Sequence, residues 1–172
     1  MKPEHVDEFR AFVMGSQGHL RRSAYVLCGD WHLAEDLVQS AYDRVFRAWH
    51  RVRAMDLPDA YARKVVYRCF LDSKARQRES TTLDALGDGP TAPADDADIR
   101  LTILAALADL APRTRAVVAL RYWEDQSVEQ TAAMLGISTG TVKSMAARGL
   151  AQLRERLGES FSTLLPDSTD IR

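Results

Sequence analysis

The stretch SVEQTAAMLGISTGTVKSMAARGLAQLRER, residues 127–156, decides the fold of this chain. Ser127, with Gln130 three residues later, has the pattern of a capping box, which begins a helix. Gly136 stands where the end of a helix favours a left-handed backbone, and Ser138 can cap a second helix. The spacing therefore predicts a helix-turn-helix, a motif whose second helix lies in the major groove of DNA.

Apolar residues recur at helical spacing along both predicted helices, at Val128, Ala132, Leu135, Val142, Ala146, Leu150 and Leu153. Ala132 is small, which suits two helices that cross steeply and approach closely. A generic antiparallel helix pair is the alternative. We favour the helix-turn-helix because the caps, the turn and the apolar stripe agree with one another.

Length and composition restrict the remaining possibilities. The chain has 172 residues with 46% apolar content, enough for one ordinary domain or two small ones. No apolar run approaches the roughly 20 residues needed to cross a bilayer, and the N-terminus lacks the apolar centre of a signal peptide. Cys28 and Cys69 are isolated, so we expect buried thiols rather than a zinc site or a disulfide framework. We therefore expect a cytoplasmic protein without membrane contact.

The net charge of −1 hides an uneven distribution. Residues 59–78 carry +4, residues 79–100 carry −5, and residues 127–158 carry +2. Electrostatic interactions in physiological salt reach only about 8–10 Å, so these blocks can act separately. The overall neutrality is a cancellation and does not exclude a nucleic-acid partner.

The pattern predicts an all-α chain, with two small helical domains joined by an acidic flexible linker. The linker is rich in Gly, Pro and Asp and has no sustained period. No strand-like alternation and no internal repeat are found. We expect a first domain at residues 1–78, the linker at 79–98, a second domain at 99–158 and a short polar tail at 159–172.

Individual helices can also be placed. In the first domain, Gly15 and Gly18 are expected to separate a short helix from a second one. The clearest amphipathic helix covers residues 32–49, and a basic helix follows at residues 59–78. In the second domain, Pro112 suits the first turn of a helix.

Several of these features, taken in order, resemble a bacterial RNA polymerase sigma factor of the short, two-domain extracytoplasmic-function group. They are AEDLVQ at residues 34–39, a basic aromatic helix, an acidic linker, and LAPRTRAVVALRYWED followed by SVEQTAAMLGISTGTVKS within residues 110–144. The resemblance covers about residues 5–157. AEDLVQ alone would be weak, but both motifs in this order and at this spacing are specific.

The resemblance implies a non-enzymatic protein without cofactor or metal. Its first domain would bind core RNA polymerase and open the downstream promoter element, and its last domain would read the upstream element as duplex. Core RNA polymerase and promoter DNA are the implied partners, and the family often adds an anti-sigma factor.

By this resemblance, core polymerase binds the outer face of the helix that contains AEDLVQ. The implied residues are Glu35, Asp36, Gln39, Asp43 and Arg47. A polar face of mixed charge favours specificity over raw affinity. An ordinary solvated helix face is the alternative that composition alone supports, and the family match favours the functional interpretation.

Opening DNA requires groups that hold unstacked bases and groups that bind phosphates. The region 50–78 offers both, through Arg51, Arg53, Arg63, Lys64, Tyr67 and Arg68. Core packing is an equal alternative for Tyr67. Arg68 stands where the family usually has asparagine, so no base preference is carried over to this position.

The N-terminal end of the second motif helix is expected to reach base edges. The candidates there are Thr139, Thr141, Lys143 and Ser144. Lys143 can donate to guanine O6 and N7, whereas capping is the alternative for Thr141. Phosphates, which position a protein without specifying sequence, are expected to bind Arg113, Arg115 and Arg148.

Two departures from the family pattern lie on the same helix. Met145 stands where the family often has arginine, and it is expected to pack inward. Gly149 in a helix interior costs roughly 1 kcal/mol relative to alanine. Both departures predict weaker binding of the upstream element than is usual.

Two other functions compete with this interpretation. A stand-alone helix-turn-helix transcriptional regulator would normally carry a sensor or receiver domain with strands, whereas residues 1–78 have a helical pattern. An enzyme acting on DNA would need a nucleophile or converging metal-binding carboxylates; the four histidines are scattered, and no catalytic residue emerges. The acidic linker is interpreted as a solubilising tether, with shielding of the basic helix as the alternative.

Overall fold

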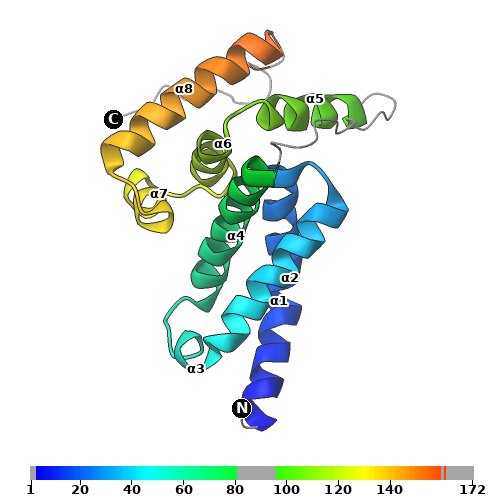
Figure 1. Cartoon of the computed structure of the whole chain (residues 1–172), viewed down its shortest axis with the longest axis vertical. Coiled ribbons are helices and arrows are strands. Elements are labelled where there is room, and N and C mark those ends of the chain that lie inside the picture. Colours follow the sequence, from blue (N-terminus) through cyan, green and yellow to red (C-terminus); the bar gives the residue numbers. More distant parts are fainter. Residues whose placement is uncertain (1–2, 81–95, 160, 162–172) are drawn as a thin grey trace. The chain divides into compact units, whose positions relative to one another are not determined.

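The computed structural model describes residues 3–80, 96–159 and Phe161, and within these residues the regular structure is entirely helical. The chain divides into two compact units (Figure 1). The first unit holds helices α1 to α4, the second holds α5, α6, η1 and α8, and α7 is divided between them. The predicted all-α fold class is confirmed in the described part of the chain.

The first unit consists of three long helices and one short one. They are α1 (Pro3–Cys28), α2 (Trp31–Arg47), α3 (Trp49–Val52) and α4 (Pro58–Ser80). The predicted break near Gly15 and Gly18 is wrong, because α1 continues through both residues. Each glycine costs roughly 1 kcal/mol in a helix, but α1 packs along α2 and α4, and this packing outweighs the local preference.

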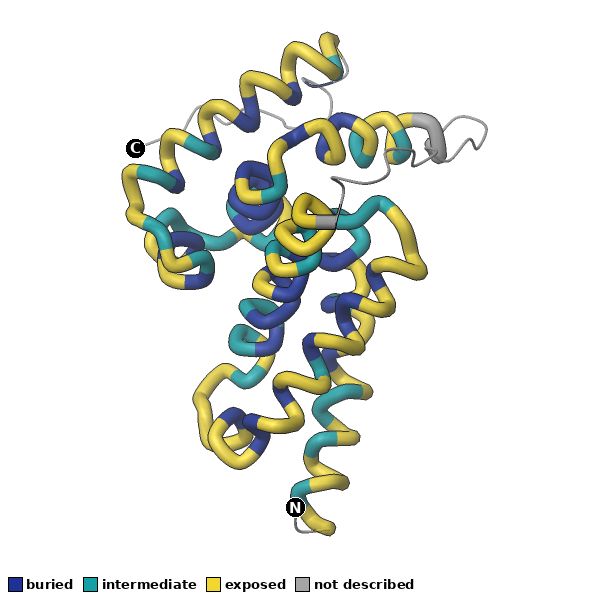
Figure 2. The backbone as a smooth tube through the Cα atoms, in the orientation of Figure 1, coloured by how far each residue is buried: buried dark blue, intermediate teal, exposed yellow. Residues whose placement is uncertain are grey.

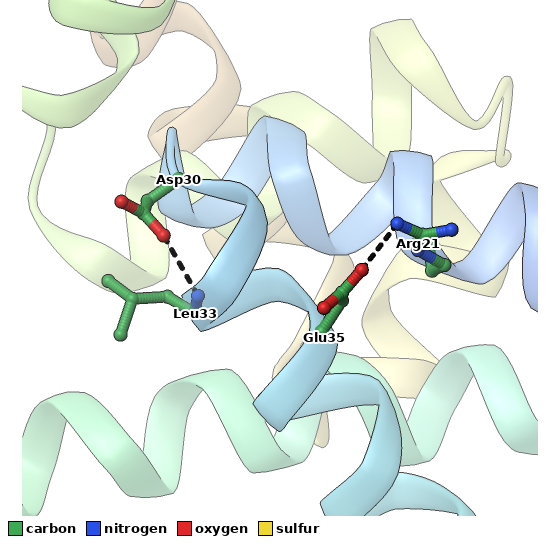
Figure 3. A network of polar contacts seen from close by, with 4 residues as sticks. All are labelled: Arg21, Asp30, Leu33 and Glu35. Carbon is green, nitrogen blue, oxygen red and sulfur yellow. Dashed lines mark hydrogen bonds and ion pairs between the residues drawn. The ribbon is translucent and has the colours of Figure 1, made fainter.

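The turn between α1 and α2 is tight and well capped. Gly29 has a φ of +71°, a left-handed conformation that favours glycine. Asp30 then caps α2, since its carboxylate accepts a hydrogen bond from the Leu33 amide at 2.9 Å (Figure 3). This geometry turns the chain back so that α2 lies against α1.

The core of the first unit forms where α1, α2 and α4 meet. α2 buries Ala34, Leu37, Val38, Ala41 and Val45, at the spacing predicted for its apolar side. Leu20 and Leu27 of α1 and Val66 and Phe70 of α4 are fully buried, and buried positions recur along each of these helices in Figure 2. The outer side of α2 is left exposed, which is the side that the sequence assigns to a partner.

The second unit contains α5 (Asp96–Ala108), α6 (Pro112–Val118), the π-helical turn η1 (Ala119–Trp123) and α8 (Thr139–Leu157), with α7 (Val128–Leu135) before the last. Pro112 is the first residue of α6, as predicted. Of the predicted linker, residues 79–80 belong to α4 and residues 96–98 to α5. The other linker residues, and most of the predicted tail, lie outside the described residues.

Gly149 has a structural role that helix propensity does not reveal. It is buried where α8 packs against α6. A β-carbon at this position would lie 2.6 Å from Cγ2 of Val118 and 3.0 Å from Cγ2 of Thr114. These separations are shorter than van der Waals contact, so only glycine lets the two helices approach this closely. The glycine is therefore a packing requirement of the second unit.

We expect Gly149→Ala to destabilise the protein by about 1–3 kcal/mol, because the added methyl group overpacks the α6–α8 contact. Gly15→Ala is the matched control. No described atom outside the helix lies within 4 Å of a β-carbon at Gly15, so we expect this change to stabilise by up to about 1 kcal/mol. Urea denaturation measures the free energy of unfolding of both variants. If Gly149→Ala stabilised the protein as much as Gly15→Ala does, the packing role of Gly149 would be contradicted.

Candidate polymerase-binding and nucleic-acid interfaces

The helix-turn-helix has the capping geometry that its sequence predicts. Ser127 and Gln130 form a reciprocal capping box, with the Gln130 amide donating to Ser127 Oγ at 3.0 Å and the Ser127 amide donating to Gln130 Oε1 at 2.8 Å. Gly136 ends α7 with a φ of +66°. Ser138 caps α8 by accepting from the Thr141 amide at 3.1 Å. The predicted motif is therefore confirmed, and α8 is its second helix.

The N-terminal end of α8 presents most of the predicted base-reading residues to solvent. Thr139, Lys143 and Ser144 are exposed, and Arg148 is exposed on a later turn. Thr141 is half-buried, and its hydroxyl shares a 2.8 Å hydrogen bond with Ser138 Oγ. Thr141 therefore acts in the cap, which leaves Thr139 and Lys143 as the residues best placed for a groove. Met145 is half-buried.

Arg115 does not point to solvent, so its prediction as a phosphate ligand is wrong. The residue is only 7% exposed, and its Nη2 donates to the carbonyl oxygens of Ala108 at 2.7 Å and Leu110 at 3.1 Å. The last carbonyls of a helix lack intrahelical donors. Arg115 supplies a donor to Ala108, the last residue of α5, and to Leu110 in the turn between α5 and α6.

Arg113, the other predicted phosphate ligand of α6, is exposed. It lies in the first turn of this helix. Of the basic residues predicted to bind the upstream element, three are therefore exposed on the second unit: Arg113 on α6, and Lys143 and Arg148 on α8.

In the first unit, the five predicted polymerase-binding residues are all exposed on α2: Glu35, Asp36, Gln39, Asp43 and Arg47. They do not form one site. Glu35, Gln39 and Asp43 line a groove of about 440 Å³ between α1 and α2. Asp36 instead lines a cleft that α2 forms with α4. The groove is therefore the more coherent candidate interface on this unit.

Sequence reasoning missed the α1 side of this groove. Phe9, Val13, Gln17 and Arg21 line it opposite α2. Arg21 Nη2 lies 2.5 Å from Glu35 Oε1, so an ion pair joins the two walls (Figure 3). The spacing of these four residues by four along one helix face is a signal that could have identified them.

Arg53, a predicted ligand of the opened strand, already has a partner. Its Nε and Nη2 donate to both carboxylate oxygens of Glu8, at 2.6 and 2.7 Å. The hydrogen bond from Arg53 holds the pKa of Glu8 below its usual range. Both side chains are partly exposed. The carboxylate therefore occupies the guanidinium in the bidentate way that a phosphate would.

The other basic residues of this region differ in their exposure. Arg51 and Arg68 are exposed, whereas Arg63 and Lys64 are half-buried. Arg51 and Arg68 can therefore contribute positive charge directly to a nucleic-acid surface, whereas Nε of Arg63 is buried.

Tyr67 is fully buried, so it does not offer its ring to a base, and this prediction is wrong. Successive residues advance by about 100° around a helix. Val65, Val66 and Tyr67 are all buried and together span about 200° of α4. The buried side of α4 is thus wide enough to include Tyr67, and the core alternative holds for this residue.

The described residues contain no group of three or more side chains suited to a metal ion. None of the described helices has both the length and the apolar character needed to cross a membrane. Cys69 is buried, which raises the pKa of its thiol, and Cys28 is half-buried. Neither cysteine forms a disulfide.

Comparison with known proteins adds evidence that is independent of the geometry. Residues 12–80 match the family described as Sigma-70 region 2, and residues 106–155 match Sigma-70, region 4. The RNA polymerase sigma-E factor of Streptomyces coelicolor is 42% identical over 155 residues, covering 87% of this chain and 86% of the relative. The ECF RNA polymerase sigma factor SigE of Mycolicibacterium smegmatis is 36% identical, covering 82% and 58%.

A solved structure also has the same fold. The sigma factor RpoE of Bartonella quintana, in complex with the anti-sigma factor NepR, superimposes with a TM-score of 0.64 at 24% identity. The match covers 88% of this chain and 98% of that one. Sequence identity with curated relatives carries the assignment: the chain belongs to the sigma-70 family of RNA polymerase sigma factors, in the extracytoplasmic-function group.

Proposed function

We propose that this protein binds core RNA polymerase through its first unit and selects promoters by two separate DNA contacts. α8 and Arg113 contact the upstream element as duplex. Basic residues of α3, of the loop that follows it and of α4 hold the opened downstream strand. The observation that carries the proposal is the order of the two sigma-70 regions along the chain, with the N-terminal end of α8 exposed for DNA.

The location of each contact follows from the exposed residues. On the first unit, core polymerase binds Glu35, Gln39 and Asp43 in the α1–α2 groove and the exposed Asp36 and Arg47 elsewhere on α2. Downstream DNA binds Arg51, Arg53, Arg63, Lys64 and Arg68. The functional limits of the two domains lie near residues 1–78 and 99–158.

The partners and the place of action follow from this function. The cytoplasm is where polymerase and promoter DNA meet. The Bartonella quintana relative was solved with an anti-sigma factor, which supports a regulator of the same class for this protein. The match of residues 12–80 to Sigma-70 region 2 argues against a stand-alone regulator, which would not need a polymerase-binding domain.

In vitro transcription with purified core polymerase tests the function directly. We expect the protein to produce defined transcripts from a subset of a random promoter library, and core polymerase alone to produce none of them. The sequences enriched among active templates identify both promoter elements. Transcription that is independent of this protein, or DNA binding without any complex with core polymerase, would overturn the proposal.

Within the upstream contact, Lys143→Ala and Arg113→Ala should act differently. We expect Lys143→Ala to reduce discrimination between promoter sequences by about 1–3 kcal/mol at one position, because Lys143 reads a base edge. Arg113→Ala should weaken binding to all promoter sequences equally, because Arg113 contacts a phosphate. It should also reduce the slope of log binding constant against log salt concentration by about 1. Competition binding with holoenzyme at several salt concentrations measures both effects. Equal loss on every sequence for Lys143→Ala would contradict base reading.

Within the downstream contact, Glu8 competes with DNA for Arg53. We expect Glu8→Gln to strengthen holoenzyme binding to single-stranded downstream-element DNA a few-fold at low salt, because it releases the guanidinium fork from an exposed carboxylate. Asp7→Asn is the matched control, since it removes the same charge one residue away, where the carboxylate pairs with Arg10 instead. The gain should disappear when Arg53→Ala is added. An equal gain for Asp7→Asn would show a general charge effect instead.

A further inference from the structure

We propose that the polymerase-binding surface extends beyond the α1–α2 groove onto an adjoining hollow in which Trp31 is the anchor. The hollow has a volume of about 460 Å³ and is lined by Gly18, Arg21, Arg22 and Trp31. The inference rests on the proposed polymerase contact of α2 and adds a second, aromatic part to it. No feature of the sigma-70 match assigns a role to Trp31.

Trp31 is an exposed aromatic residue in a fixed position. It is the first residue of α2, directly after the Asp30 cap, and 44% of it is exposed. Its ring stacks on that of Tyr25, with centroids 4.0 Å apart and an angle of 6° between the planes. The Arg21 guanidinium lies 5.7 Å from the Trp31 centroid. A ring held in this way loses little conformational freedom on binding, which is the property of an interface anchor.

The groups around Trp31 define the chemistry of the partner. Arg22 lines the hollow and has no ion-pair partner among the described residues. Leu33, two residues after Trp31 on α2, is 50% exposed but lines the cleft between α2 and α4, so it is not part of this hollow. The surface therefore fits a protein segment that brings a carboxylate to Arg22 and an apolar side chain to Trp31. Tryptophan and arginine are the residues most enriched in interface hot spots.

Gly18 lines the hollow, and no packing contact among the described residues requires a glycine there. At Gly149 the neighbouring helix requires glycine, but a β-carbon at Gly18 would meet only Arg22 Nη1, at the ordinary distance of 3.9 Å. Glycine inside α1 costs roughly 1 kcal/mol of helix stability. Its absent side chain instead leaves room beside Trp31, which an approaching partner can use.

The position of the hollow favours polymerase over nucleic acid. Arg21 lines both the hollow and the α1–α2 groove, so the two are continuous. Asp30 directly precedes Trp31 and Glu35 follows it by four residues, and their carboxylates oppose a phosphate backbone. A single partner that lies along α2 would therefore reach the Trp31 hollow without leaving the proposed interface.

The test uses the full chain and purified core polymerase, with dissociation constants from a labelled-protein binding assay. We expect Trp31→Ala to weaken binding by about 10- to 100-fold, mainly through faster dissociation. Trp31→Phe should retain most of the affinity. Arg22→Glu, on an exposed side chain, should weaken binding without affecting folding. Leu57→Ala is the control, because Leu57 is an exposed apolar residue of the loop before α4. It should bind as tightly as the unmodified chain.

A double variant, Gln39→Ala with Asp43→Ala, separates this inference from the proposed function. If it weakens binding while Trp31→Ala and Arg22→Glu bind normally, the Trp31 hollow is not part of the interface and the inference is overturned. If the unmodified chain does not bind core polymerase, the proposed function fails first. Weaker binding of Trp31→Ala to single-stranded DNA, with normal binding to core polymerase, would overturn the inference in favour of a base-stacking surface. Unchanged melting temperatures confirm that each variant is folded.

Discussion

The close crossing of α6 and α8 at Gly149 is the constraint on which the DNA-binding side of this protein depends. Val118 and Thr114 occupy the space that a β-carbon would need, so the helices lie closer than ordinary side chains permit. α6 begins next to Arg113, and α8 carries Lys143 near its start. The separation between the proposed phosphate-binding and base-reading side chains is therefore determined by interior packing rather than by those side chains themselves.

Local features were predictable because they depend on residues three or four positions apart. The capping box at Ser127 and the left-handed Gly136 belong to this class, and so does the buried side of α2. Arg115 and Gly149 were misjudged because their environment comes from another helix. Arg115 looks like a surface cation until the unpaired carbonyls of α5 are placed beside it. Gly149 looks unfavourable until α6 packs on it.

The candidate sites were predictable to a similar degree. The exposure of the α2 residues followed from the apolar side that they oppose, but their grouping did not. Glu35 lines a groove with α1, while Asp36, one residue later, lines a cleft with α4. The pairing of Arg53 with Glu8 joins residues 45 positions apart, which no local pattern encodes. The exposure of a helix face is thus readable from the sequence, whereas the partners of each charge depend on tertiary structure.

The order in which the helices pack also bears on how the protein folds. In the first unit α1 packs on α2 and α4, and α2 on α4; in the second unit α5 and α6 pack on α8, so each helix packs on helices at most a few elements away in the chain. Proteins dominated by such local contacts fold quickly, because little loop-closure entropy must be lost before packing begins. The bundle formed by α1 to α4 is synthesised before α7 and α8. It can therefore fold on the ribosome before α8 emerges.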